Sequence, residues 1–98
     1  MDAKARRALL TIRACLAVGR YYVLTHFTER MDHRGLVWPD VQAVVDAPGR
    51  VRDAGRGDRY GRPKWIIGGT AADGEPLEFV CVLDTEERGR VTVFITIF

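Results

Sequence analysis

The chain has 98 residues, of which 47% are hydrophobic and 29% charged, with 10 glycines and 4 prolines. This is the composition of an ordinary globular protein, and it excludes intrinsic disorder, collagen and disulfide-dense secreted scaffolds. Because chains split into several domains only beyond about 250–300 residues, we expect a single domain over residues 1–98.

The net charge of +2 is unevenly spread along the chain. Residues 1–35 carry +4 and residues 36–70 carry +2, whereas residues 71–98 carry −4. A basic N-terminal and central region suits contact with a polyanion or an acidic partner. No apolar run approaches the roughly 20 residues of a membrane span, and the N-terminus lacks a convincing signal-cleavage site. We therefore expect a cytoplasmic protein without membrane contact.

The two cysteines, Cys15 and Cys81, lie far apart in the sequence. Neither belongs to a Cys-x-x-Cys motif, and neither has a histidine at ligand spacing. This pattern argues against a zinc finger and, in a reducing compartment, against a structural disulfide. We expect two buried free thiols that pack as small hydrophobic groups.

The first predicted element is a helix over residues 2–18. Asp2 can serve as its N-cap, and Gly19 can end it. Its apolar residues recur at i, i+3 and i+7, and they are Leu9, Ile12 and Leu16. The short aromatic and β-branched segment 21–24 that follows predicts a strand.

Two further helices are expected before the pattern changes. Thr25 fits the N-cap of the second helix, and Gly35 fits its C′ position. The third helix begins near Trp38 with Pro39 in the first helical position, and it ends at residues 47–49.

After the third helix the hydrophobic period changes from 3.6 to 2, which indicates strands. We expect a short strand over 50–53, a glycine-rich loop over 54–63, and a meander of strands over 64–70, 77–84 and 90–97. In the last strand Val91, Val93, Ile95 and Ile97 alternate with Thr92, Phe94, Thr96 and Phe98. These two sets are expected on opposite faces of the sheet.

Helices followed by antiparallel strands predict an α+β fold. In this fold the N-terminal helices cover one face of a three- or four-stranded antiparallel sheet. The other face is expected to be partly open, with Thr92 and Thr96 beside exposed aromatic side chains. This face is interpreted either as a ligand surface or as a hydrophobic dimer face.

The second helix carries the pattern most suggestive of chemistry. His26, Arg30 and Arg34 recur at i, i+4 and i+8, beside an apolar stripe formed by Phe27 and Met31. Packing of the apolar stripe would leave the basic ridge at the edge of the sheet. Like charges at this spacing repel each other, and a bound phosphate would relieve the repulsion.

Such a ridge suits cleavage of RNA through its own 2′-hydroxyl. His26 can act as general acid or base because the unperturbed pKa of histidine is about 6.5. Arg30 and Arg34 can hold the phosphate through paired hydrogen bonds, and Thr96 can orient it. This chemistry requires no metal and no cofactor. The alternative is a structural histidine beside solvated or salt-bridged arginines.

A second basic cluster lies in and after the glycine-rich loop. It consists of Arg59, Tyr60, Arg62 and Lys64. The cations can follow a nucleic-acid backbone while the tyrosine stacks on a base. The alternative is an ordinary solvated loop. The sequence has no phosphate-binding, dinucleotide-binding or His-Glu-x-x-His metal motif.

Several separated pieces of the chain occur in the order of a known bacterial family. They are Thr25-His26, Glu29-Arg30-Met31, Arg34-Gly35-Leu36, Asp40-Val41, Trp65-Ile66-Ile67-Gly68-Gly69, Asp73-Gly74-Glu75-Pro76-Leu77 and Ile95-Thr96-Ile97-Phe98. With these pieces the chain resembles, over nearly its whole length, the family known as domain of unknown function 4258.

The resemblance implies a RelE-like helix-on-sheet domain related to RelE/ParE-like toxins. It also implies a function, that of the toxin in a type II toxin–antitoxin pair, which cleaves RNA on the ribosome or free, or poisons the cell in another way, and has a cognate antitoxin as partner. The family's histidine and arginines fall on His26, Arg30 and Arg34, and its terminal threonine on Thr96.

Two positions depart from the family pattern. Glu78 replaces a histidine that often follows Pro-Leu, and Phe98 replaces the final tyrosine. If either residue supplied a proton in relatives, this chain lacks that donor. Two other functions therefore stay open. One is a non-catalytic RNA- or protein-binding module, and the other is a protein that dimerises through its last strand, with Phe94 and Phe98 as the contact face.

Overall fold

The computed structural model describes residues 1–55 and 61–98. These residues form three helices and five strands. The order is α1 (Ala3–Val18), β1 (Tyr21–Val23), α2 (Thr25–Arg34), α3 (Trp38–Asp46), β2 (Arg50–Asp53), β3 (Lys64–Thr70), β4 (Pro76–Glu86) and β5 (Gly89–Ile97). Within this described part, no helix is long and apolar enough to cross a membrane.

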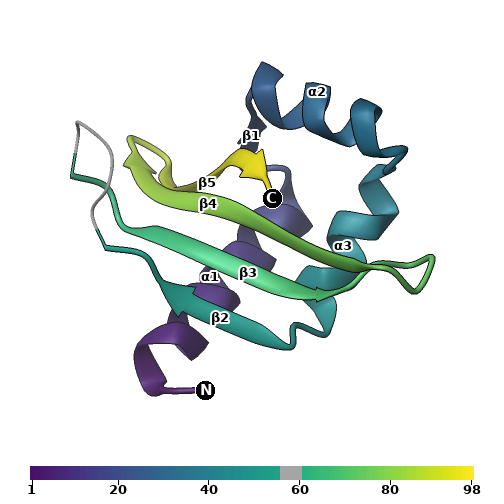
Figure 1. The fold of residues 1–98 in the computed structure, drawn as a ribbon. Coiled ribbons are helices and arrows are strands. Elements are labelled where there is room, and N and C mark those ends of the chain that lie inside the picture. The colour runs from purple at the N-terminus through teal and green to yellow at the C-terminus, as the bar shows by residue number, and fades with distance from the viewer. Residues whose placement is uncertain (56–60) are drawn as a thin grey trace.

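The five strands form one sheet in the order β1-β5-β4-β3-β2 (Figure 1). Strands β2 to β5 pair antiparallel with their neighbours, whereas β1 pairs parallel to β5, with Tyr22 opposite Val93. The α+β class is confirmed. The expected sheet of three or four strands, all antiparallel, is wrong. Residues 21–23 add a strand beside β5, and this pair is parallel. The long connection that a parallel pair requires is supplied by the chain between β1 and β5.

The local signals at the helix ends are mostly confirmed. The Asp2 carboxylate accepts a hydrogen bond from the Ala5 amide at 2.7 Å, and Gly19 ends α1 with φ +76°. Gly35 ends α2 with φ +67°, as expected. The N-cap of α2, however, is Leu24, and Thr25 is already the first helical residue, so the expected threonine cap is wrong.

The hydrophobic core lies between the three helices and one face of the sheet (Figure 1). Ile12 of α1, Phe27 of α2 and Val44 of α3 are fully buried in it, together with Phe79 and Phe94 from the sheet. Phe94 has four aromatic neighbours among the residues that the structure describes. Its ring centroid lies 5.2 to 6.0 Å from those of Tyr21, Phe27, Trp38 and Phe79.

A β-bulge in β5 changes the expected alternation of its side chains. Cys81 is opposite Phe94 and Val80 is opposite Thr96, so the register passes over Ile95. As a result, Phe94 and Ile97 both belong to the helix-covered core, although strict alternation placed them on opposite faces.

The two threonines of β5 lie on different faces of the sheet. Thr92 is fully buried, and its hydroxyl has no hydrogen-bond partner within the described residues. Thr92 therefore does not lie on the open face, contrary to expectation. Thr96 is half-buried and lies opposite Val80, on the face away from the helices. The dimer face expected from Phe94 is also wrong, because Phe94 is buried and β5 lies inside the sheet rather than at an edge.

Both cysteines are buried and free, as the sequence predicts. Cys81 is fully buried among the core strands, and burial raises the pKa of its thiol well above the ordinary value of 9.0. The folded protein thus keeps this thiol neutral at a pH where the unfolded chain ionises it. The stability that this group contributes is present below the unfolded pKa and is lost as pH rises toward the folded pKa.

We expect the free energy of unfolding to fall above pH 9.0 more steeply in the wild type than in Cys81→Ala. A single thiol can make the free energies of unfolding of the two proteins diverge by at most about 1.4 kcal/mol per pH unit. Urea denaturation of both proteins at neutral and alkaline pH measures this difference. Tyrosines and lysines also titrate at alkaline pH, but they are the same in both proteins, so their contribution drops out of the comparison. Identical pH dependences would contradict the prediction.

Candidate functional site

Helix α2 lies against the C-terminal end of β5. Phe27 and Met31 fix its orientation because both enter the core. The Phe27 ring lies 6.0 Å from that of Phe79 and 5.5 Å from that of Phe94, measured between centroids. Residues three or four positions apart share one side of a helix, so this packing directs Arg30 and Arg34 along the end of the sheet.

Arg30 and Arg34 converge on the end of β5 and the residue that follows it. Arg30 Nε donates a hydrogen bond to the Ile97 carbonyl at 3.1 Å. Arg34 Nη1 donates to the main-chain oxygen of Phe98, and Nη2 donates to the Pro76 carbonyl at 3.4 Å. A guanidinium has five N–H groups, so both arginines keep donors for an anion. Neither arginine forms an ion pair with an acidic residue in the described part of the chain.

His26 lies in the first turn of α2 and is exposed. Its imidazole makes no hydrogen bond to any residue that the structure describes, and it precedes Arg30 by one helical turn. His33, the second histidine, is exposed near the end of the helix. We call His26, Arg30 and Arg34 the α2 ridge. The structure keeps these three side chains along one flank of one helix.

Thr96 is near the α2 ridge but faces another direction. It immediately precedes Ile97, whose carbonyl binds Arg30, yet it lies on the sheet face opposite the helices. No hydrogen bond joins the Thr96 hydroxyl to the ridge within the described residues. The structure therefore brings the two arginines together and leaves the orienting role of Thr96 a prediction.

The two positions that depart from the family pattern lie at the same corner of the sheet. The Phe98 amide donates to the Glu78 carbonyl at 3.0 Å, and the Phe98 side chain is 56% exposed. The Glu78 carboxylate accepts from Arg50 Nη2 at 2.7 Å, and Arg52 lies 3.9 Å from it. Arg50 was not singled out from the sequence, because only the pairing of distant strands places it beside Glu78.

The second predicted basic cluster is only partly described. Arg59 and Tyr60 lie outside the described residues. Arg62 Nη1 forms an ion pair with Asp84 at 3.1 Å, and Lys64 is half-buried at the start of β3. The RNA-binding role of these residues stays a prediction.

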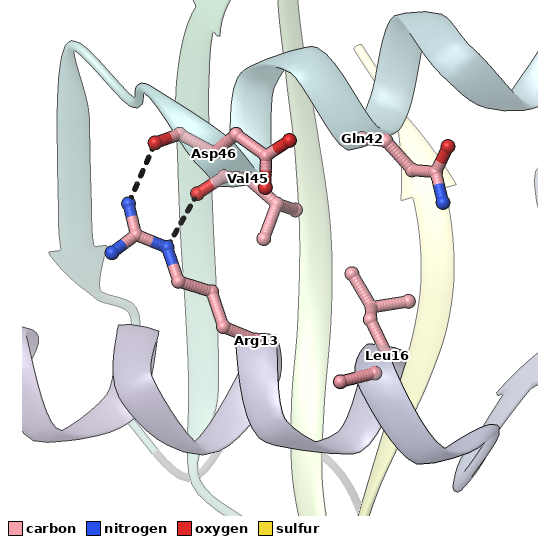
Figure 2. Close-up of a pocket in the computed structure, with 6 residues that line it drawn as sticks. Arg13, Leu16, Gln42, Val45 and Asp46 are labelled. Atoms are coloured by element: carbon pink, nitrogen blue, oxygen red, sulfur yellow. Dashed lines mark hydrogen bonds between the residues drawn. The ribbon is translucent and has the colours of Figure 1, made fainter.

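A pocket of about 310 Å³ lies between α1 and α3 (Figure 2). Arg13 Nε donates to the Val45 carbonyl at 3.0 Å, and Arg13 Nη2 donates to the Asp46 carbonyl at 2.8 Å. These oxygens belong to the last turn of α3, where carbonyls lack helical partners and the helix dipole favours a cation. Arg13 is thus a C-terminal cap that joins two helices.

The comparisons with known proteins identify the family. A family model described as "Domain of unknown function (DUF4258)" matches residues 23–98. The chain belongs to the DUF4258 family. The DUF4258 match begins in β1 and includes the α2 ridge and Thr96, whereas α1 precedes it. No curated protein and no solved structure matches the chain.

Proposed function

We propose that this DUF4258 protein is a metal-independent endoribonuclease with the α2 ridge as its reactive centre. One observation carries the proposal. Two arginines are fixed by hydrogen bonds at the end of β5, and an exposed histidine precedes them by one helical turn on the same helix. Cations held in place before the substrate arrives stabilise a developing negative charge without reorganisation.

In the proposed reaction His26 removes the proton of an RNA 2′-hydroxyl. The 2′-oxygen attacks the adjacent phosphorus, and the bond from phosphorus to the 5′-oxygen breaks. Arg30 and Arg34 bind the phosphate oxygens through their remaining N–H groups. Solvent water protonates the departing 5′-oxygen, since Phe98 has no hydroxyl and Glu78 is paired with Arg50. The products are a 2′,3′-cyclic phosphate and a 5′-hydroxyl.

The proposed biological role is that of the toxin in a type II toxin–antitoxin pair, acting in the cytoplasm. The support for this role is the resemblance to RelE/ParE-like toxins, and it implies a cognate antitoxin as partner. The segment that supplies the ridge belongs to the DUF4258 match, which is consistent with the residues carried over from the family pattern.

Substrates that differ only at the 2′-position test the proposed reaction. We expect the protein to cleave an RNA oligonucleotide in the presence of EDTA and to leave a 2′,3′-cyclic phosphate end. A matched oligonucleotide with 2′-O-methyl groups should resist cleavage. Both substrates are assayed with and without ribosomes, so that a requirement for the ribosome is detected. Cleavage of the methylated strand, or no cleavage under any of these conditions, would contradict the proposal.

A second candidate function is RNA binding without cleavage. It is favoured by one specific observation: Glu78 and Phe98 leave this corner of the sheet without the histidine and tyrosine that relatives often have. The α2 ridge would then hold a phosphate and break no bond. Salt-dependent affinity for both oligonucleotides, with no products, would support this function.

A further inference from the structure

One flank of α1 lines a groove that neither the family match nor the α2 ridge explains. Two adjoining pockets of about 330 and 270 Å³ share Thr11 and Arg90 and therefore form one groove, which we call the α1 groove. Its wall on α1 runs from Lys4 to Val18, a length of about 21 Å at 1.5 Å per residue. Its facing wall comes from Arg20 before β1, Pro63 before β3, the β4–β5 turn and the sheet itself, through Trp65, Leu83, Arg88 and Arg90.

The charge of the α1 groove is strongly one-sided. Among the described residues its lining includes five cationic residues and no acidic one, and the cationic residues are Lys4, Arg7, Arg20, Arg88 and Arg90. Lys4 is paired with Asp53 at 2.6 Å, and Arg20 donates to the main-chain oxygens of Gly89 and Arg90.

The other three cations are uncompensated. Arg7, Arg88 and Arg90 are exposed, and their side chains make no hydrogen bond or ion pair with any residue that the structure describes. Uncompensated like charges around one groove repel each other, and they attract an anionic occupant. Arg13, on the opposite flank of α1, differs because both of its contacts are with α3.

The apolar part of the described lining on α1 is mainly aliphatic. Ala8, Ala14 and Val18 line the groove from α1, and Val18 is 70% exposed. Trp65 is the aromatic residue among the described lining residues, but it is only 3% exposed, and Lys4 Nζ lies 5.9 Å from its ring centroid. Single-stranded nucleic acids bind by stacking bases on open aromatic faces, and the described lining residues of this groove offer none. An occupant that carries aliphatic side chains between carboxylates matches this aliphatic lining and its cationic surroundings better than a single-stranded nucleic acid does.

We propose that the α1 groove binds an acidic, amphipathic segment of a partner protein. The aliphatic side chains of that segment pack on Ala14 and Val18, and its carboxylates pair with Arg7, Arg88 and Arg90. Arg90 lies near the start of β5, and Ile97, which binds Arg30, lies at its end. Seven residues of strand separate the two by about 23 Å, so an occupied groove leaves the α2 ridge uncovered. The proposal is thus independent of RNA cleavage.

The test uses a fluorescein-labelled synthetic peptide of Glu and Leu, with Leu at i, i+3, i+4 and i+7 and Glu elsewhere. Fluorescence anisotropy with the full chain should give a dissociation constant on the order of 10 μM, which increases with salt. The double variant Arg88→Gln/Arg90→Gln should bind about fivefold more weakly, since two exposed ion pairs are lost. The control Arg6→Gln/Arg52→Gln removes the same charge elsewhere and should bind as the wild type does.

Two further probes complete the test. A scrambled peptide of the same composition should bind at least about tenfold more weakly because it cannot place Leu on one side. Oligouridine should bind more weakly than the peptide. Amide shifts in NMR spectra should include Thr11, Ala14 and Val18. The proposal is overturned by absent binding, by equal binding of the scrambled peptide, by equal effects of the two double variants, or by tighter binding of oligouridine.

Discussion

Replacement of Phe94 by alanine is expected to lower the free energy of unfolding by about 3–5 kcal/mol. The side chain is fully buried, and four aromatic rings surround it. Its backbone pairs with β1 through Val23 and with β4 through Cys81. Truncation therefore opens a cavity where the sheet and α2 meet. Since small domains have only about 5–15 kcal/mol of stability, a large share of it is lost.

Phe98→Ala is the matched control for this substitution. It removes the same atoms from the same end of the chain, but from a side chain that is 56% exposed. We expect a change of about 0.5 kcal/mol or less. Urea denaturation followed by circular dichroism measures both variants. Equal losses of stability would show that Phe94 does not have the central place in the core that its contacts indicate.

Replacement of His26 by alanine is expected to reduce the rate of RNA cleavage by about 10²- to 10⁴-fold. The imidazole is the group of the α2 ridge that can act as a general base, since arginine keeps its proton. Because the side chain is exposed and makes no hydrogen bond within the described residues, its removal should leave the folded structure intact. Cleavage of a fluorescent RNA by equal amounts of folded protein measures the effect.

His33→Ala controls for the loss of an exposed imidazole from the same helix. The two histidines are seven residues apart, so His33 lies on the same side of α2 as His26 but about 10.5 Å further along the helix axis, and one phosphate held by Arg30 and Arg34 does not place both in the same role. We expect His33→Ala to cleave at nearly the wild-type rate. A His26→Ala protein as active as His33→Ala would remove the basis of the proposed mechanism.

The secondary structure could be predicted where local signals decide it. Asp2 and Gly19 delimit α1, and the strand over 64–70 matches β3. The parallel pairing of β1 with β5 could not be predicted, because it depends on contacts between residues about 70 positions apart. The bulge at Ile95 was also hidden, since a regular alternation of side chains does not reveal a register shift.

The same distinction applies to the candidate sites. The spacing of His26, Arg30 and Arg34 is enough by itself to predict that they share one flank of a helix. The hydrogen bonds of both arginines to the end of β5 depend on tertiary packing, as does the ion pair between Arg50 and Glu78. The α1 groove was missed for the same reason, because part of its wall comes from the β4–β5 turn.

The pairing of β5 with β1 inside the sheet affects how the chain folds during its synthesis. Synthesis proceeds from the N-terminus, so α1, β1 and α2 leave the ribosome long before the strand that pairs with β1. Until then Phe27 has no Phe94 ring to pack against and Ile12 lacks the sheet side of the core, so the nascent chain exposes both. Non-local pairing of this kind slows folding and favours aggregation of the unfinished chain. Chaperones that shield apolar segments during translation should therefore raise the yield of folded protein.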